Sequence, residues 1–426
     1  MNNQCELPMV SVEEAQQIVL DSVNRLGAQR VPLLDAVGRV LAEDVVSDID
    51  ITPFNNAAMD GFALKSADIE GATKESPIEV DVIDEVPAGA YFEGTLQAGQ
   101  AVRIMTGAPV PASADTVVKY EIVDYLGGTG RAGTRVAFSE PSPVNKNIRM
   151  AGEEVAAGQA GLHAGDVLKC AGAGLAAECG AVEVSVFKKP RVGVIALGSE
   201  LVGPETVPQK GQIRDGNSFA LAASIAAAGA LPVIMPVVAD DAAAIEAALL
   251  SAVGECDFVI TSGGASNGDY DHIKDVVSSV GQLKLTLMNM KPGKAVTFGL
   301  VEGVPVLGVP GNPAAALCVF EMLARPALLK MQGYLQVFRT TVQAVLGKRC
   351  KKKDTRRTFV RALLERNDKG DLVATPVGSQ SSGVFGALQA AGCLLVLPEG
   401  VREQGYVDEG TPVECIPFGV EEGVVL

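Results

Sequence analysis

The sequence contains no tryptophan and few other aromatic residues, 13 Phe and 6 Tyr among 426. Many proteins hold single-stranded nucleic acid by stacking its bases on aromatic side chains, so no such surface is expected. Lys and Arg number 35 against 51 Asp and Glu, a net charge of −16 at pH 7 that also disfavours a general polyanion binder. An anionic ligand would therefore need a local cationic pocket or a metal ion.

Cysteine and histidine occur in no metal-binding pattern. There is no CxxC spacing and there are only two histidines, His163 and His272, so a zinc or iron–sulfur site is not expected. Scattered thiols and a first segment without a basic region or apolar core predict a cytoplasmic protein without a secretory signal. The eight cysteines are Cys5, Cys170, Cys179, Cys256, Cys318, Cys350, Cys393 and Cys415.

One stretch without charge, residues 219–238, is long enough to cross a membrane. Gly229 and two prolines interrupt it, which favours an Ala-rich helix followed by a buried strand. We therefore expect no membrane association.

The order of patterns predicts a multidomain α/β plus β protein. Apolar strands alternate with helices after residue 186, which is typical of a doubly wound, mostly parallel sheet covered on both faces. Short strands separated by turns precede and follow this region. We expect an α/β core domain (8–27 and 186–335), a connecting domain (28–46 and 147–185) that includes a helix in LLDAVGRVLAED, a β-rich module (47–146) and a C-terminal β-barrel-like domain (336–426).

The segment TSGGASNGDYDHIK (261–274) directly follows a buried strand, DFVI. Ligands of parallel α/β sheets bind beyond the carboxyl ends of the strands. Ser262, Gly263 and Gly264 could bring backbone amides close to a phosphate. Asp271 could cap the next helix, but Asp269 is then a surplus carboxylate of the kind that Mg²⁺ requires.

Three further loops could reach the same edge of the sheet. Asn312 as helix cap and Pro313 as first helical residue explain the Pro310–Pro313 loop structurally. Lys291-Pro292-Gly293-Lys294 is typical of an exposed hairpin tip, yet its lysines are natural counter-charges for a ligand in an acidic chain. Gly198-Ser199-Glu200 follows the first core strand. The basic run KRCKKKDTRR (348–357) is interpreted as an exposed connection rather than a binding site for an anionic partner.

Several of these segments form an ordered series: FNNAAMDGFAL, RIMTGAPVPASADTVV, NIRMAGEEV, TSGGASNGDYDHI, MKPGKAVTFG and VLGVPGNPAAAL. The series resembles the molybdopterin molybdotransferase family, which includes bacterial MoeA and the gephyrin E domain, and the resemblance covers roughly residues 8–420. The resemblance implies an elongated homodimer of four-domain subunits. It also implies magnesium-dependent insertion of molybdate into adenylated molybdopterin, with release of AMP. The implied partners are a molybdopterin adenylyltransferase and recipient molybdoenzymes or their chaperones.

The resemblance also assigns roles to residues of this chain. Metal ligation is implied for Asp271, Glu200, Asp240 or Asp241, and Glu154. Asp60 and Thr106, with Glu200 and Asp271, match catalytic positions. Substrate binding is implied for Ser262, Gly263, Gly264, Lys291, Lys294, Pro310 and Pro313, and for Arg361 and Ser382, which match positions thought to face the site from the partner subunit.

The sequence departs from the family pattern at five positions, so alternative functions stay open. Asn55 and Ala57 replace Asp and Ser, Ser199 replaces Asp, Asn267 replaces a small apolar residue, and Ala295 stands where proline often follows. A tungstate-handling paralogue, a non-catalytic pterin-binding scaffold and the sibling reaction, adenylation of molybdopterin, are the alternatives. The acids and lysines of the motifs persist, which favours the molybdotransferase.

Overall fold

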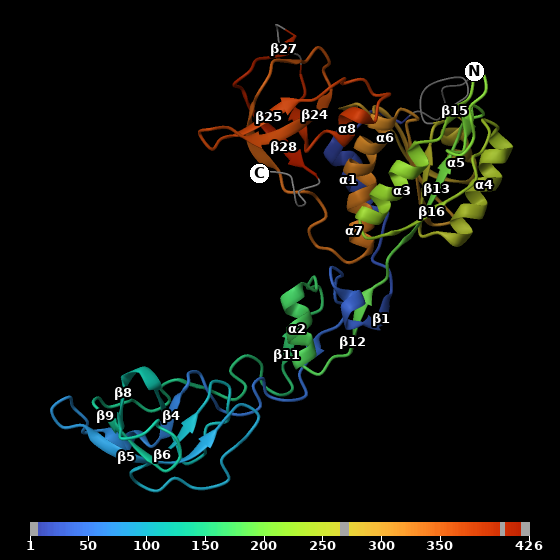
Figure 1. Ribbon diagram of the computed structural model, residues 1–426. Coiled ribbons are helices and arrows are strands. Elements are labelled where there is room, and N and C mark those ends of the chain that lie inside the picture. The colour runs from blue at the N-terminus through green and yellow to red at the C-terminus, as the bar shows by residue number, and fades with distance from the viewer. Residues whose placement is uncertain (1–6, 265–271, 401–404, 419–426) are drawn as a thin grey trace. The chain divides into compact units, whose positions relative to one another are not determined.

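The computed structural model describes residues 7–264, 272–400 and 405–418. The chain divides into two compact units, residues 30–186 and residues 1–29 together with 187–426 (Figure 1). No helix within the described ranges is both long enough and apolar enough to cross a bilayer. Residues 219–238 instead contain most of helix α3 (Asn217–Ala227), followed by strand β16 (Leu231–Ile234), so the expected order of helix and strand is confirmed. The expected burial of the strand is wrong, because β16 is an edge strand and Leu231 and Ile234 are exposed.

The core of the larger unit is the predicted doubly wound sheet. Its six strands lie in the order β16-β13-β17-β21-β20-β18; the first four are mutually parallel, and β20 and β18 are antiparallel additions at one edge. The other five strands of this sheet are β13 Arg191–Ala196, β17 Phe258–Ser262, β21 Val304–Val309, β20 Ala295–Val301 and β18 Gly281–Leu287.

Helices cover both faces of this sheet, because its strands carry apolar side chains on both sides. Val194 and Ile260 pack in one cluster with residues of α1, α3, α6 and α7, whereas Ile195 and Val259 pack with α4 and α5 on the other face (Figure 1). The remaining helices are α1 Val12–Asp21, α4 Ala242–Glu255, α5 Ile273–Val280, α6 Pro313–Val319 and α7 Arg325–Met331.

Helix ends follow local rules in this unit. Ser11 and Glu14 form a reciprocal capping box at the start of α1. Pro313 is the first residue of α6, where its missing amide hydrogen costs nothing. A π-helical turn, Phe320–Ala324, joins α6 to α7.

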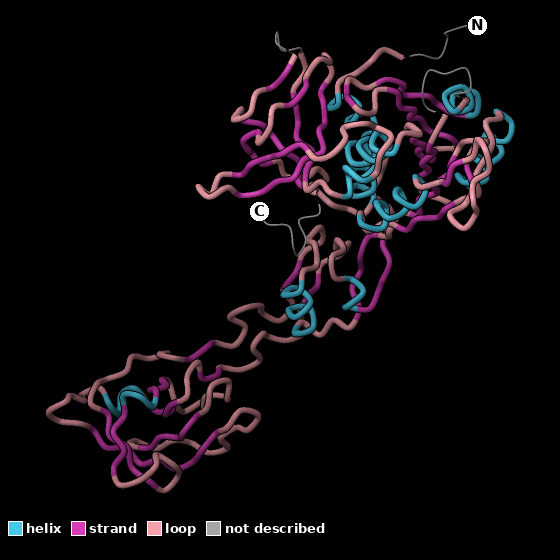
Figure 2. The backbone as a smooth tube through the Cα atoms, turned by 45° about the horizontal axis from the view of Figure 1, so that its top comes forward, coloured by secondary structure: helices cyan, strands magenta, loops and turns pink. Residues whose placement is uncertain are grey.

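The C-terminal domain belongs to the same unit and is built mostly of strands (Figure 2). Strand β24 pairs with both β25 and β26, and β22 and β28 complete the ring, so the sheet closes into a small barrel. A core segment, β19 (Met290–Lys291), adds to the free end of β24 in parallel. The barrel strands are β22 Val342–Leu346, β24 Arg357–Arg366, β25 Leu372–Pro376, β26 Cys393–Leu397 and β28 Pro412–Pro417; the short elements are β23 Cys350–Lys351, β27 Tyr406–Val407 and α8 Gly386–Gln389.

The smaller unit contains a six-stranded sheet in the order β7-β4-β6-β5-β9-β8. Its bounds are β4 Gly61–Leu64, β5 Ile78–Val86, β6 Gln100–Ile104, β7 Thr116–Lys119, β8 Val123–Leu126 and β9 Thr134–Phe138. The other elements are β1 Ala28–Pro32, β2 Val45–Val46, β3 Asn56–Ala57, β10 Ile148–Arg149, β11 Ala160–Leu162, α2 Cys170–Glu178 and β12 Glu183–Phe187.

The prediction of a helix in LLDAVGRVLAED (33–44) is wrong. Only a 3₁₀ turn, Leu33–Ala36, forms. Gly38 then adopts a positive φ of 81°, and Val40 and Leu41 form bridges to Val167 and Val186 instead of a further helical turn. Tertiary pairing thus overrides a periodic pattern that was too short to form a helix by itself.

Candidate active site

The glycine turn after β17 requires glycine at both positions. Gly263 has φ +97° and Gly264 has φ +63°, a region that other residues rarely adopt. A Cβ atom on Gly263 would lie 2.4 Å from the carbonyl oxygen of Leu197. The Gly263 amide donates to the Val309 carbonyl (3.1 Å), so this amide holds the strand ends together and is not free for a ligand.

The Pro310–Pro313 turn lies directly against the glycine turn. A Cβ atom on Gly311 would be 3.6 Å from the Cα of Gly263. The side-chain amide of Asn217, in the first turn of α3, donates to the Ser262 hydroxyl and to the Gly311 carbonyl, both at 2.8 Å. Two turns that are distant in sequence are therefore fixed beside each other.

Asn312 occupies the predicted N-cap position of α6, but its side chain makes no capping hydrogen bond. The first-turn amide of Ala314 donates instead to the backbone carbonyl of Ser382 (2.9 Å). A loop of the C-terminal domain thereby takes the place of the cap and lies at the same edge of the core sheet.

A cavity of about 590 Å³ opens over these turns and contains carboxylates. Its lining includes the Ser262–Gly264 and Pro310–Pro313 turns together with Glu200, Asp215 and Asp240. Asp215 is buried and accepts from the Ser218 amide (3.0 Å) at the start of α3. Glu200 folds back over Gly198, where a Cβ atom would be 2.7 Å from Glu200 Oε2.

Asp240, and not Asp241, lines this cavity. Asp241 is the N-cap of α4 and accepts from the Ala244 amide (2.9 Å), which commits its carboxylate to the helix end. Asp240 accepts from the Ser199 amide (3.2 Å), and its own amide donates to the Ser199 hydroxyl (3.3 Å). Of the two positions that the resemblance left open for a metal ligand, Asp240 is the one that lines the cavity.

The carboxylates of this cavity suit a hard divalent cation only with help from a ligand. No group of three or more His, Cys, Asp or Glu side chains that could hold a metal occurs in the described part of the chain. Mg²⁺ is commonly held by one or two carboxylates plus phosphate oxygens and water, which Glu200 and Asp240 could satisfy. Asp269, Asp271 and Asn267 lie outside the described residues.

Lys291 and Lys294, here called the twin lysines, line a second cavity of about 660 Å³. Pro310 and Asn312 line both this cavity and the first. Gly293, between them, has φ +103°, and a Cβ atom there would be 2.7 Å from Val319 Cγ2 of α6. The pairing of β19 with β24 (Met290 with Arg357, Lys291 with Thr358) brings this turn beside the strand that carries Arg361. Arg361 and Ser382 thus line the same cavity as Lys291 and Lys294 of this chain.

The charge of this second cavity is opposite to that of the whole chain. Among the described residues that line it, one side chain is acidic, Asp354, and nine are basic. The basic residues are Lys291, Lys294, Lys348, Arg349, Lys351, Lys352, Lys353, Arg356 and Arg361.

Among the residues that the structure describes, Arg361 is the largest fully buried side chain, with 2 % of its surface exposed. Its Nη2 donates to the carbonyls of Ser379 (3.2 Å) and Ser381 (2.9 Å), but its buried Nε has no partner and no carboxylate pairs with it among the described residues. Burial lowers the pKa of Arg361, since desolvation disfavours the charged form. A buried guanidinium without a counter-ion is typical of an anion-binding site.

Asp354 is already paired. It accepts from Arg356 Nε (2.8 Å) and Nη2 (2.6 Å) and lies 3.5 Å from Lys291 Nζ. The hydrogen bond from Arg356 holds the pKa of Asp354 far below its usual range. Asp354 therefore offsets the charge of Arg356 and part of that of Lys291, and the other cations of the cavity keep a surplus of positive charge.

Three motif segments of the smaller unit also come together. Asp60 Oδ1 accepts from both the amide (2.7 Å) and the hydroxyl (2.8 Å) of Thr106, which lowers the pKa of Asp60. Strand β3 pairs with β10, and the Asn55 side chain accepts from the Ala151 amide (2.8 Å). Glu154 lies in the same unit, where its amide donates to the Ile51 carbonyl (3.2 Å).

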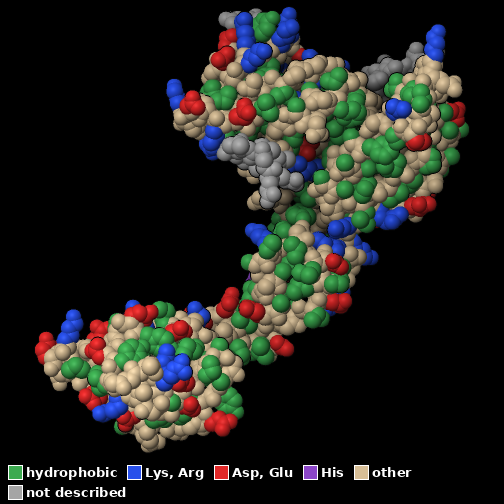
Figure 3. Space-filling view, in the orientation of Figure 1, with side chains coloured by type: hydrophobic (Ala, Val, Ile, Leu, Met, Phe, Trp, Pro, Cys, Tyr) green, Lys and Arg blue, Asp and Glu red, His purple; other side chains and the backbone are tan. Residues whose placement is uncertain are grey.

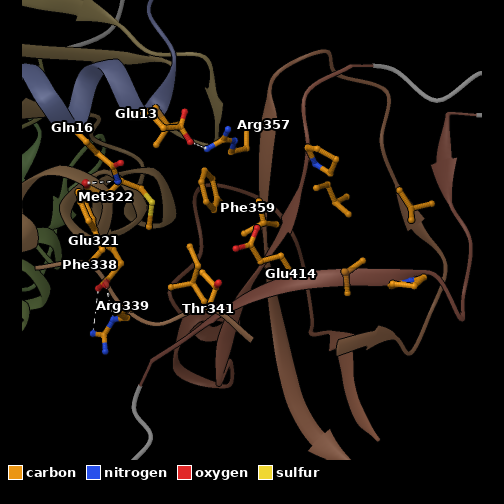
Figure 4. Close-up of a pocket in the computed structure, with 18 of the residues that line it drawn as sticks. Glu13, Gln16, Glu321, Met322, Phe338, Arg339, Thr341, Arg357, Phe359 and Glu414 are labelled. Carbon is orange, nitrogen blue, oxygen red and sulfur yellow. Dashed lines mark hydrogen bonds and ion pairs between the residues drawn. The ribbon is translucent and has the colours of Figure 1, made fainter. Parts of the chain in front are cut away.

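A third cavity, of about 490 Å³, lies between α1, the π-helical turn and the barrel. Figure 4 shows that most of its charged side chains pair with one another, Glu13 with Arg357 and Glu321 with Arg339, whereas Glu414 also lines it. None of the motif residues that the structure describes lines it. It is consequently the weaker candidate for the reaction site.

Comparisons with known proteins agree with this architecture. Residues 10–180 match the family model "MoeA N-terminal region (domain I and II)", residues 193–330 "Probable molybdopterin binding domain", and residues 343–418 "MoeA C-terminal region (domain IV)". These matches define a multidomain protein built around a molybdopterin-binding fold.

Full-length relatives make the assignment more specific. The chain is 38 % identical to molybdopterin molybdenumtransferase 2 of Mycobacterium tuberculosis over 93 % of this chain and 97 % of that protein, and 34 % identical to molybdopterin molybdenumtransferase of Staphylococcus aureus over 92 % of each. A crystal structure of the molybdopterin biosynthesis MoeA protein from Pyrococcus horikoshii matches with TM-score 0.81 and 30 % identity, over 97 % of this chain and 100 % of that one. The chain belongs to the MoeA family.

Proposed function

We propose that this chain is a molybdopterin molybdenumtransferase that inserts molybdenum from molybdate into adenylated molybdopterin, with release of AMP. Relatives that are 34 % and 38 % identical over nearly the whole chain carry that name. The chain accordingly has a role in molybdenum cofactor biosynthesis as a transferase.

The adjacency of two oppositely charged cavities carries the proposal for the site. The first, here called the acidic cavity, is lined among the described residues by three carboxylates, one base (Arg214) and the glycine turn. The second, here called the cationic cavity, is lined by an excess of cations that includes the buried Arg361, and Pro310 and Asn312 line both. The reaction needs a place for a nucleotide-linked phosphoanhydride next to a place for a tetrahedral oxyanion. Neighbouring cavities of this kind support the proposal, because they would hold both reactants in a fixed orientation.

On the cationic side, Arg361 and Ser382 are proposed to bind molybdate. The Nε of Arg361 is buried and has no partner among the described residues, and the residue lines the cavity, so its guanidinium brings an uncompensated positive charge to the cavity wall. Lys291 and Lys294 add positive charge beside the turn that joins the cavities. They are proposed to stabilise negative charge that develops on the phosphate as AMP leaves.

On the acidic side, Mg²⁺ is the proposed cofactor, with Glu200 and Asp240 as ligands. When bound, Mg²⁺ offsets phosphate charge and polarises the anhydride. Ser262 is proposed to support the site through Asn217, since its hydroxyl accepts from the Asn217 amide. Asp271 remains a proposed catalytic residue and metal ligand, and Asp60, Thr106 and Glu154 are proposed from the family resemblance.

Release of AMP tests this proposal most simply. Purified protein is incubated with adenylated molybdopterin, molybdate and Mg²⁺, and AMP is measured. We expect AMP release that depends on molybdate and that falls by at least about tenfold in Glu200→Gln, as for loss of one positioned charge. Glu255→Gln, an exposed change outside both cavities, is the matched control.

The same assay separates the alternatives. Consumption of ATP with molybdopterin as substrate would indicate the adenylating reaction. Preference for tungstate over molybdate in competition would indicate a tungstate-handling paralogue. Binding of adenylated molybdopterin without AMP release would indicate a scaffold.

Further parts of the proposal concern assembly and location. A homodimer, transient complexes with an adenylyltransferase and with recipient molybdoenzymes or their chaperones, and a cytoplasmic location are all proposed from the family resemblance. Light scattering of the purified protein tests the dimer: a monomeric mass at micromolar concentration would contradict it.

A further inference from the structure

The basic run 348–357, expected to be an exposed connection, lines the cationic cavity. Its residues differ in what they do. Arg356 pairs with Asp354, and Arg349 lies 3.1 Å from Asp408 and stacks over the ring of Tyr406. Lys352 is buried, and its Nζ donates to the Asp354 carbonyl (2.6 Å), the Arg356 carbonyl and Thr358 Oγ1 (3.3 Å).

These contacts fix the backbone of the run. Strand β23 pairs with β27, and the Lys352 amide donates to the Gly405 carbonyl (2.9 Å). The burial of Lys352 and its acceptors means that this lysine holds the loop in place and is not available to a ligand. The basic run is therefore an ordered part of the cavity wall, fixed by these hydrogen bonds.

Three lysines of the run are left over: Lys348, Lys351 and Lys353, here called the rim lysines. All three are exposed, line the cavity and form no ion pair within the described ranges. In Figure 3 Lys and Arg side chains gather at the tip of the C-terminal domain, where Figure 1 labels β27, the partner of β23. The rim lysines thus add charge beyond Arg361 and the twin lysines, in a molecule of net charge −16.

We propose that the rim lysines form an outer anion subsite that binds a small doubly charged oxyanion ahead of the inner position at Arg361. This inference rests on the proposed function for the identity of the anion. The ligand chemistry is a tetrahedral dianion, either inorganic molybdate or the phosphate of AMP. A subsite of exposed lysines attracts such an anion over distances of about one Debye length, roughly 10 Å at 0.1 M salt.

Calorimetric titration of the full-length protein tests the subsite without any need for turnover. The rim variant is Lys348→Gln/Lys351→Gln/Lys353→Gln. The control is Lys188→Gln/Lys210→Gln/Lys369→Gln, which removes the same charge from exposed lysines of the same unit that do not line the cavity. Molybdate and AMP are titrated separately, in low and in high sodium chloride.

At low salt we expect the rim variant to bind at least one of the two anions about three- to tenfold more weakly than the control, as for loss of three exposed charges near a dianion. The difference should vanish in about 0.5 M salt, because the charges are exposed to solvent. Weaker binding of molybdate alone assigns the subsite to the inorganic oxyanion, and weaker binding of AMP alone assigns it to the nucleotide phosphate.

Equal affinities of the rim variant and the control for both anions would overturn the subsite. Far-ultraviolet circular dichroism and thermal unfolding of both variants verify that they fold. If wild-type protein binds the anions but releases no AMP from adenylated molybdopterin, the proposed function fails while the subsite stands.

Discussion

Asn217 and Ser262 are joined by a 2.8 Å hydrogen bond, and the same Asn217 amide also donates to the Gly311 carbonyl. One side chain from the start of α3 therefore connects the turn after β17 with the turn after β21. Both turns line the acidic cavity, and the second turn also lines the cationic cavity. The relationship explains how the two halves of the candidate site keep a fixed distance.

A double-mutant cycle on this pair should show coupling. Asn217→Ala and Ser262→Ala are each expected to lower the free energy of unfolding, by about 1–3 and 0.5–1.5 kcal/mol, because the first loses two hydrogen bonds and the second one. The cycle should give a coupling energy of about 0.5–1.5 kcal/mol in urea unfolding. Strict additivity of the two changes would show that the hydrogen bond does not form in solution.

Arg361 should be essential for anion binding but not for folding. Arg361→Met keeps most of the volume and removes a buried charge that has no carboxylate partner among the described residues, so we expect a change in stability within about 1 kcal/mol. Molybdate affinity, measured by calorimetry, should fall on the order of tenfold or more. Arg366→Met, on the same strand but exposed and outside the cavity, should bind molybdate as wild type does.

The carboxylate of Asp354 is expected to weaken the binding of anions in the cationic cavity. Asp354→Asn removes the one acidic side chain among the described lining residues, so molybdate affinity should rise about two- to fivefold at low salt. Asp368→Asn, an exposed change on the barrel outside the cavity, is the control. An unchanged or lower affinity in Asp354→Asn would contradict the electrostatic description of the cavity.

The Asp60–Thr106 pair gives a dependence of stability on pH. The pKa of Asp60 is lowered in the folded state by hydrogen bonds from the Thr106 amide and hydroxyl. A carboxyl with a depressed folded pKa stabilises the protein above its unfolded pKa, near 3.8, and this stabilisation is lost as pH falls through the folded pKa.

Asp60→Asn should therefore lower the Tm of the smaller unit at pH 7, and the difference from wild type should shrink below about pH 4. Thr106→Ser, which keeps both donors, is the control. A difference in Tm that is the same at pH 7 and pH 3 would show that the charge of Asp60 is not involved.

The sequence alone was sufficient to predict that the candidate loops lie at one edge of the core sheet. The loops that follow β17 and β21 must meet, because carboxyl ends of adjacent parallel strands lie side by side. It also predicted the capping box of Ser11 and Glu14, since both partners lie within one helical turn.

Other features depend on tertiary pairing and escaped prediction. The basic run reaches the cavity only because β19 of the core pairs with β24 of the barrel. Asp240 and Asp241 are both acidic, and only the start of α4 decides which of them caps the helix. Asn217 gave no signal as a connector, because its two acceptors lie 45 and 94 residues further along the chain.

A crystal structure of the protein soaked with tungstate, magnesium and AMP tests the central claim most directly. Tungstate has the shape and charge of molybdate and scatters X-rays anomalously. We predict an anomalous peak in the cationic cavity within hydrogen-bonding reach of Arg361, Lys294 or Ser382, with the AMP phosphate across the Pro310–Pro313 turn. A tungstate peak bound only elsewhere on the protein, with both cavities unoccupied by ligand, would contradict the account.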